Sequence, residues 1–182
     1  ARLDLPPGPV IGHVARWDWT KDHATFLAAL ANVPLAQAVM IGQGISRDNA
    51  DLMALVRAHA LESRVHLLGL RTDVPDLMPG FDVFCLSSRN ESLPGVICEA
   101  MACGVPCVAT DVGDVAEVVG DTGRIVPPEN PAALASALRA LLADPNRTTL
   151  GRAARARIAT RPDMPAMVQA YRDLYRVLGW TA

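Results

Sequence analysis

The sequence predicts an α/β fold in which a doubly wound parallel sheet is covered by helices on both faces. Short apolar runs alternate along the chain with longer segments of helical period. The run at 36–41 shows no polar alternation after Gln37, which suits a strand buried on both sides. Parallel strands need crossover connections, and each crossover helix buries its apolar stripe on the sheet.

The individual elements follow from the same patterns. Gly42-Gln43-Gly44 ends the second apolar run, and an apolar stripe with three- and four-residue steps at 52–59 predicts the helix that follows. Gly104 and then Asp144-Pro145 end two later helices. The expected strands are 9–15, 36–41, 65–68, 81–86 and 106–109, with 124–126 as a candidate sixth. The expected helices are 21–32, the segment around 52–59, a short turn at 73–78, 95–103, a helix from 131 to 143 and more helix in the tail.

Length and composition indicate one globular domain. The chain has 182 residues, of which 51% are hydrophobic and 20% are charged. We expect a linker from a preceding domain at 1–8, a ligand-binding domain at 9–160 and a helical tail at 161–182. A net charge of −2 without any Lys/Arg run argues against nucleic-acid binding. Apolar stretches such as 26–31 and 52–56 are too short to span a membrane.

Cysteine and histidine spacing does not indicate a metal site. The four cysteines, at 85, 98, 103 and 107, form no Cys-x-x-Cys pair and lie among apolar residues, so we interpret them as buried thiols in a reducing compartment. No Asp-x-Asp signature occurs, and the four histidines lack metal-ligand spacing. We therefore expect no metal and no other cofactor, and a cytoplasmic location in which any membrane contact is made by another part of the protein.

A ligand site is expected where the carboxyl ends of the strands meet, because βα loops and helix N-termini gather there. The loop at 87–95 is the most informative, since it leaves a strand and opens a helix that contains Glu99. Pro94 and Gly95 suit a helix start whose free amides stabilise a phosphate. Glu99 can accept hydrogen bonds from two ribose hydroxyls, and Glu91 can hold a second polyol.

Arg16 and Lys21 flank the first strand-to-helix connection and face the same edge of the sheet. Two cations there would neutralise a diphosphate placed between two sugars. Each residue also has an ordinary interpretation. Arg16 suits a solvated surface position, Lys21 a helix start, Glu91 the surface and Glu99 a favourable helix charge.

Four longer segments of the sequence, taken together, are more specific than any single motif. They are Gly12 to Arg16 followed by Lys21, Val39 to Gly44, Val65 to Gly69, and Glu91 to Gly104 followed by Pro106 and Thr110. Together they resemble the retaining glycosyltransferases of the B-type fold that share a Glu-x7-Glu motif. The resemblance implies the carboxyl-terminal, donor-binding half of a GT-B architecture, with a Rossmann-like fold, and a preceding domain that binds the acceptor.

The resemblance also implies residue roles. Arg16 and Lys21 would contact the donor diphosphate, Glu99 the ribose and Glu91 the donor sugar. The nucleotide base would lie near Gly69, Leu70 and Arg71, and the segment Ser92, Leu93, Pro94, Gly95 and Val96 would complete the donor site. The reaction would be a retaining transfer of a hexose from a nucleotide-diphosphate sugar to an acceptor hydroxyl, without a covalent nucleophile. By family frequency, UDP-hexose is the first expected donor and GDP-mannose the second.

Some positions depart from the family pattern. Ser92 and Asp22 stand where glycine is frequent, and Trp17 and Trp19 enlarge the loop before Lys21. We expect the tryptophans to face the preceding domain or the acceptor, with local packing as the alternative, and His13 is a candidate cleft residue. Two other functions remain open, namely a nucleotide-sugar-binding module that has lost transfer and a nucleotide-sugar epimerase or phosphorylase.

Overall fold

The computed structural model describes residues 3, 5–161 and 164–179. These residues contain one six-stranded sheet in the order β3-β2-β1-β4-β5-β6, and every pair of neighbouring strands is parallel. The predicted α/β sheet is therefore confirmed, including its candidate sixth strand. The strands are β1 (Val10–Val14), β2 (Gln37–Ile41), β3 (Val65–Leu67), β4 (Val83–Leu86), β5 (Cys107–Thr110) and β6 (Arg124–Val126).

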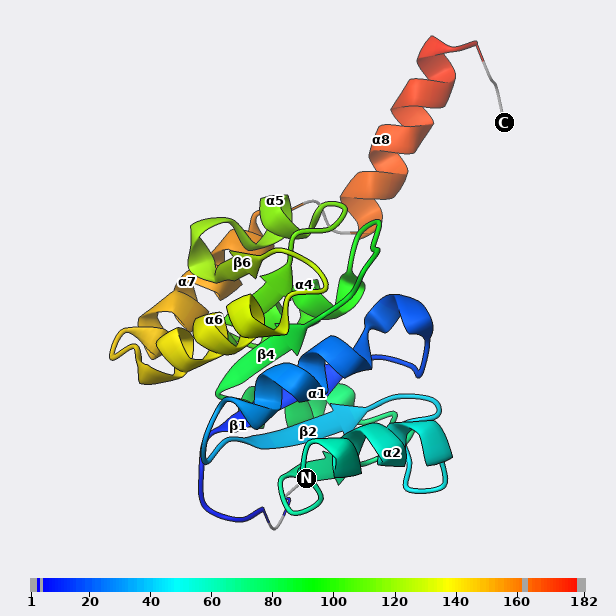
Figure 1. The fold of residues 1–182 in the computed structure, drawn as a ribbon. Coiled ribbons are helices and arrows are strands. Elements are labelled where there is room, and N and C mark those ends of the chain that lie inside the picture. The colour runs from blue at the N-terminus through cyan, green and yellow to red at the C-terminus, as the bar shows by residue number, and fades with distance from the viewer. Residues whose placement is uncertain (1–2, 4, 162–163, 180–182) are drawn as a thin grey trace.

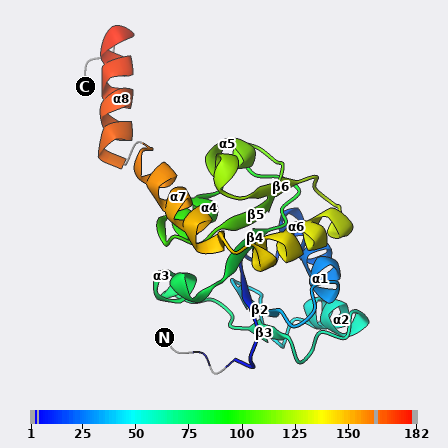
Figure 2. The same cartoon turned by 90° about the vertical axis from the view of Figure 1, so that its left-hand side faces the viewer.

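Helices cover both faces of this sheet (Figures 1 and 2). One face packs against α1 (His23–Ala31), α2 (Ala50–Ala58) and α6 (Pro131–Ala143). The other packs against α3 (Val74–Leu77), α4 (Gly95–Ala102), α5 (Val115–Val119) and α7 (Arg147–Ala159). The remaining elements are the 3-10 turns η1 (Trp19–Lys21), η2 (Met78–Gly80) and η3 (Gly120–Thr122), and the helix α8 (Met164–Val177).

Alternate residues of the central strands enter the two cores, which explains why the sequence shows apolar runs rather than alternation. In β2, Ala38 and Met40 face the α1 side, whereas Val39 and Ile41 face the α4 side. In β1, Gly12 lies on the α4 side between Val10 and Val14, which pack against the same core. A Cβ there would lie 2.0 Å from a ring carbon of Phe81, so the aromatic ring occupies the space of the missing side chain.

The predicted helix at 21–32 is shorter at its start, and this is a correction. Lys21 belongs to the turn η1, and α1 begins only at His23. Asp22 separates the two because its backbone is left-handed, with φ 46°, and its carboxylate caps α1 by accepting a hydrogen bond from the Thr25 amide. The helix α5 was not predicted, since five residues carry too little periodicity to be recognised.

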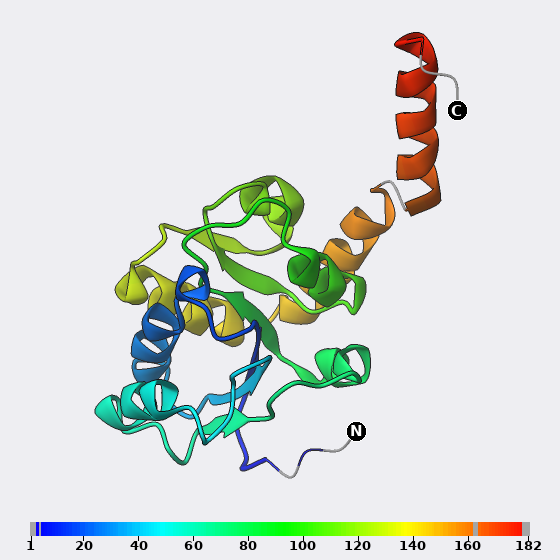
Figure 3. The same cartoon turned by 90° about the vertical axis from the view of Figure 1, so that its right-hand side faces the viewer.

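Two helices of different character follow α6. In α7, Gly151 packs on α4's terminal turn so closely that a Cβ would lie 2.0 Å from the Gly104 carbonyl oxygen. The helix α8 projects away from the sheet (Figures 1 and 3), and its described side chains are exposed. The predicted domain limits at 9–160 and 161–182 remain predictions. Residues 1, 2 and 4 of the expected linker and residues 162, 163 and 180–182 of the expected tail lie outside the described residues.

Candidate active site

Two loops meet at the carboxyl ends of the neighbouring strands β1 and β4. Lys21, from the first loop, places its Nζ 2.6 Å from Oε1 of Glu91, from the second, and the side chains are only 19% and 11% exposed. The Ser88 hydroxyl donates to the same carboxylate oxygen at 2.7 Å. Thr110, at the end of β5, donates to the Ser88 carbonyl at 2.6 Å. The structure thus brings together two predicted site residues that are 70 positions apart.

Lys21 is the only lysine in the sequence. Its backbone is fixed from β4, because the Ser87 hydroxyl donates to the Lys21 carbonyl at 2.8 Å. One residue earlier, the Thr20 carbonyl accepts from the Arg89 amide at 2.7 Å. The lysine loop therefore contacts the start of the glutamate loop through main-chain hydrogen bonds as well as through the ion pair.

The glutamate loop is supported from its other side by the segment after β5. The amide of Asp114 donates to the Ser92 carbonyl at 3.0 Å. Gly113 adopts φ 52°, and a Cβ at this position would lie 2.1 Å from the Glu91 carbonyl oxygen. Because only glycine combines this backbone angle with such a close approach, Gly113 determines how the Glu91 loop lies against the sheet.

The glutamate loop ends at the N-terminus of α4. Pro94 occupies the cap position and offers no side-chain hydrogen bond. A Cβ added at Gly95 would have no other atom within 4 Å. Among the described residues, the amides of Gly95 and Val96 have no hydrogen-bond partner. Free amides at an eight-residue helix N-terminus form a positive pole that suits an anion. Leu93, just before it, is exposed.

Glu99 lies just past the first turn of α4, as predicted, with an exposed side chain. It borders an open hollow of about 510 Å³ between α4 and α7. The hollow is also lined by Cys98, Ala102, Arg155, Ile158 and Ala159. Glu91 is not among the residues that line this hollow.

Asp22 and Arg89 form a second ion pair beside the first. Arg89 Nε lies 3.1 Å from Asp22 Oδ2, and Arg89 Nη2 donates to Asp22 Oδ1 at 3.3 Å. Thr25 donates to the same carboxylate through its amide at 3.2 Å and its hydroxyl at 2.8 Å. The Asp22 carboxylate raises the pKa of the Arg89 guanidinium. Glu129 approaches the outer side of Arg89, at 3.5 Å.

His13, the candidate cleft residue, is buried beneath the lysine loop. Its Nε2 lies 3.2 Å from the Ser87 hydroxyl oxygen. Because that hydroxyl donates its proton to the Lys21 carbonyl, Nε2 must carry the proton of the ring and donate it to Ser87. Nδ1 is then the unprotonated nitrogen, and it has no partner among the described residues.

Two aromatic rings pack against His13, and a third extends the cluster. His13 stacks at a tilt on His23 and Phe26, with centroids 5.0 and 4.5 Å apart, and Trp17 lies 4.9 Å from His23. Burial, followed by the nearby His23, lowers the pKa of His13 well below its ordinary value. Burial likewise lowers the pKa of His23 to about 4. Both imidazoles are therefore neutral at pH 7.

The other predicted residues lie further out. Arg16 is 64% exposed and lies 3.5 Å from Asp18, whereas the ion pair of Glu91 is made by Lys21. Trp17 packs on the core, in agreement with the local-packing alternative, whereas Trp19 is 73% exposed. The hydroxyl and the amide of Thr20 both donate hydrogen bonds to the Asp18 carboxylate, and these lower its pKa.

The expected base-binding segment follows β3. Gly69 adopts φ 67°, and its carbonyl accepts from the Gly42 amide at 2.8 Å. Leu70 is exposed. Arg71 forms a two-pronged ion pair with Asp73, through Nε at 2.7 Å and Nη2 at 2.5 Å, and this pairing lowers the pKa of the carboxyl. Both Nε and Nη2 of Arg71 are thereby bonded to Asp73, a neighbour in the same loop.

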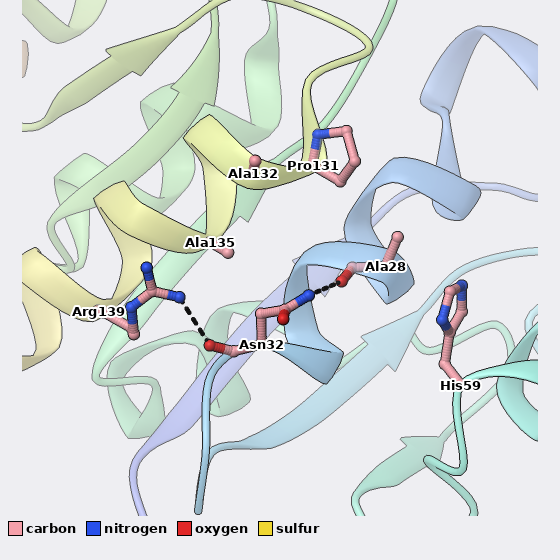
Figure 4. A pocket seen from close by; sticks show the side chains of 7 residues that line it. All are labelled: Ala28, Asn32, His59, Pro131, Ala132, Ala135 and Arg139. Atoms are coloured by element: carbon pink, nitrogen blue, oxygen red, sulfur yellow. Dashed lines mark hydrogen bonds between the residues drawn. The ribbon is translucent and has the colours of Figure 1, made fainter.

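Other features of the described residues lie apart from this edge. A hollow of about 360 Å³ between α1 and α6 contains none of the predicted site residues (Figure 4). In the described part of the chain, no three His, Cys, Asp or Glu side chains are arranged to hold a metal ion, and no helix is both long and apolar enough to cross a bilayer. Cys85 and Cys107 are buried thiols with raised pKa values, whereas Cys98 and Cys103 are half-buried, which corrects the expectation that all four are buried.

Sequence reasoning missed three supports of this site. They are the Asp22–Arg89 pair, the hydrogen bond from Ser88 to Glu91, and the approach of Gly113 to the Glu91 loop. A signal existed for the first, because Asp22 occupies a position at which glycine is frequent in the family that the sequence resembles. The other two depend on how separate loops pack, which the sequence pattern does not reveal.

Comparison with known proteins connects this geometry to a family. A family model described as "Glycosyl transferases group 1" matches residues 8–144. The N-acetyl-alpha-D-glucosaminyl L-malate synthase of Bacillus anthracis is 32% identical over 77% of this chain and 37% of its own length. The alpha-D-kanosaminyltransferase of Streptomyces kanamyceticus is 30% identical over 98% of this chain and 48% of its own length. The chain thus spans less than half the length of these relatives.

Solved structures show the same fold. The Anabaena protein HepE, in complex with UDP and glucose, superposes with a TM-score of 0.85 and 29% identity, over 93% of this chain and 48% of that one. A C-terminal domain of a group 1 glycosyltransferase from Francisella tularensis shares the fold at 23% identity, with a TM-score of 0.77 and coverage of 88% and 89%. The family model matches most of this chain, and the chain has the Rossmann-like fold of one half of the GT-B architecture. The chain therefore belongs to the group 1 glycosyltransferases.

Proposed function

We propose that this chain is the donor-binding domain of a retaining glycosyltransferase, and that it binds a nucleotide-diphosphate sugar, UDP-hexose first. The observation that carries the proposal is the pair of Lys21 and Glu91, 2.6 Å apart at the carboxyl ends of β1 and β4. Glu91 stands in the loop that ends at the N-terminus of α4, whose first two amides are free. A cation and a positive helix pole together suit a diphosphate, and a carboxylate beside them suits sugar hydroxyls.

The residues divide the donor between them. Lys21 and the α4 amides at Gly95 and Val96 bind the diphosphate, and Arg16 turns inward from its exposed position to join them. Glu91 accepts hydrogen bonds from the transferred sugar and Glu99 from the ribose. The base rests on the Gly69–Arg71 segment. The solved complexes of HepE with UDP and with UDP-glucose support this choice of ligand, because that protein shares this fold at 29% identity.

In the transfer step, the bond between the anomeric carbon and the donor's phosphate oxygen breaks while a bond to the acceptor oxygen forms on the same face. The acceptor proton passes to the departing phosphate oxygen, so no protein nucleophile is required. Negative charge grows on the leaving diphosphate, and Lys21 stabilises it there. The acceptor-binding residues belong to a further domain, as the greater length of the relatives suggests, so this chain by itself binds donor without transferring sugar.

Calorimetric titration of this chain tests the binding proposal. UDP, GDP, ADP and their hexose conjugates are each titrated to millimolar concentration into the wild type and into Lys21→Ala. We expect one nucleotide series to bind and Lys21→Ala to weaken it at least tenfold, as loss of a charge-assisted contact requires. Absence of binding by every series in the wild type would refute the assignment.

The full-length protein tests the reaction. Incubation with the preferred donor and candidate acceptors, followed by NMR of the anomeric proton, is expected to show a product with the donor's anomeric configuration. Donor binding with no product on any acceptor supports a binding module, and a new sugar nucleotide formed without acceptor supports an epimerase.

A further inference from the structure

We propose that Asp22 and Arg89 act as positioning residues, forming an ion pair that holds Lys21 against Glu91 and so prepares the diphosphate site. The inference rests on the proposed function of that site. Neither residue has a donor contact in the roles assigned above. The pair is a direct contact between the lysine loop and the glutamate loop.

Arg89 contacts the chain on both sides of Lys21. Its amide donates to the Thr20 carbonyl at 2.7 Å, and its guanidinium binds the Asp22 carboxylate at 3.1 and 3.3 Å. These contacts bind Arg89 to the residues immediately before and after Lys21. Glu91 follows Arg89 by two positions. Contacts of Arg89 on either side of Lys21 therefore connect the lysine loop to the start of the glutamate loop.

The position of Asp22 also supports the inference. Its backbone lies at φ 46°, a left-handed region that aspartate tolerates better than most L-residues, so the backbone by itself does not require the ion pair. Its carboxylate is almost fully buried, and such a charge needs a partner. Helix capping by itself uses the contacts with Thr25 and explains a polar side chain. The guanidinium of Arg89 is the additional feature, and it connects the cap to the glutamate loop.

The single lysine provides a direct probe of positioning. Reductive ¹³C-methylation of the chain labels Lys21 and the N-terminal amine and preserves the charge of both, so one NMR signal reports the surroundings of Lys21 Nζ. Glu91→Gln supplies the reference signal for a lysine without its carboxylate. Asp22→Asn keeps the acceptor oxygen for the α1 cap and tolerates the left-handed backbone, but removes the charge that binds Arg89. Arg89→Gln removes the charge from the other side.

We expect the Lys21 signal of Asp22→Asn and of Arg89→Gln to move toward the Glu91→Gln reference, and UDP affinity to fall about fivefold in each. The double variant should bind no more weakly than the weaker single variant, because both changes break one interaction. Arg89→Lys, assayed by calorimetry without methylation, should regain part of the affinity. Arg176→Gln, which breaks the exposed pair with Asp173 on α8, should leave signal and affinity unchanged.

Thermal melts recorded on every variant separate positioning from loss of fold. If Arg89→Gln fails to fold, Asp22→Asn decides, since it retains the helix cap. A wild-type Lys21 signal and wild-type affinity in the folded variants would overturn the inference. A wild type that binds no UDP would refute the proposed function instead, while the Lys21 signal would still report whether the pair positions the lysine.

Discussion

Acidification should destabilise this fold through the two buried histidines beneath the lysine loop. The folded pKa of His23 is lowered to about 4 by burial, whereas an unfolded histidine titrates near ~6.5. Between these values the unfolded state binds more protons, so the free energy of unfolding falls as the pH decreases through this window. From pH 7 to pH 5, His23 contributes a loss of about 2 kcal/mol. His13, whose pKa is also lowered by burial, adds a loss of the same sign.

Urea denaturation at pH 7 and pH 5 measures this effect. His23→Phe retains an aromatic ring beside Trp17 and His13 but cannot take a proton. The difference in unfolding free energy between the two pH values should be smaller in this variant than in the wild type by about 2 kcal/mol. Ile45→Val, a buried core change without a titrating group, should cost about 1 kcal/mol equally at both pH values. Equal pH dependence in wild type and His23→Phe would refute the reasoning.

Three further predictions concern the loops of the site. Gly113→Ala should lower the melting temperature and weaken UDP binding, because its Cβ would lie 2.1 Å from the Glu91 carbonyl and its backbone would be strained; unchanged binding in calorimetry would contradict this. Ser88→Ala removes a hydrogen bond to the Glu91 carboxylate and should lower the kcat/KM of the full-length enzyme about tenfold, with a melting temperature close to the wild type; an unchanged kcat/KM would count against the role of Glu91. Glu99→Gln should weaken binding of UDP but not of inorganic pyrophosphate, which lacks a ribose, and equal losses for both ligands would exclude a ribose contact.

The sheet could be predicted from the sequence because the pattern that defines it is local. Apolar runs such as 36–41 carry the signature of burial on both faces, and parallel pairing then requires the helices that separate them. Element boundaries were predicted less well where one residue decides them. Asp22 ends η1 and caps α1, so the helix begins two residues later than its apolar pattern suggests.

The candidate site could be predicted only in outline. Sequence reasoning places Lys21 and Glu91 at the same edge, because β1 and β4 both end there, but it cannot supply their contact at 2.6 Å. That contact depends on Ser87, Arg89 and Gly113, whose roles arise from packing between segments far apart in the chain. Arg16 shows the opposite case, since its position in the sequence is next to the site but its side chain is exposed and pairs with Asp18.

The central claim is that the amine of Lys21 binds the donor diphosphate, and the chain's single lysine allows this to be measured directly. The rate at which an amine-reactive reagent modifies Lys21 is followed by peptide mass spectrometry with and without UDP, with the N-terminal amine as the internal reference. At a UDP concentration of about ten times the Kd, we expect Lys21 to react roughly tenfold more slowly, with the N-terminal amine unaffected and uridine giving no protection. An equal rate of Lys21 modification with and without bound UDP would contradict the account.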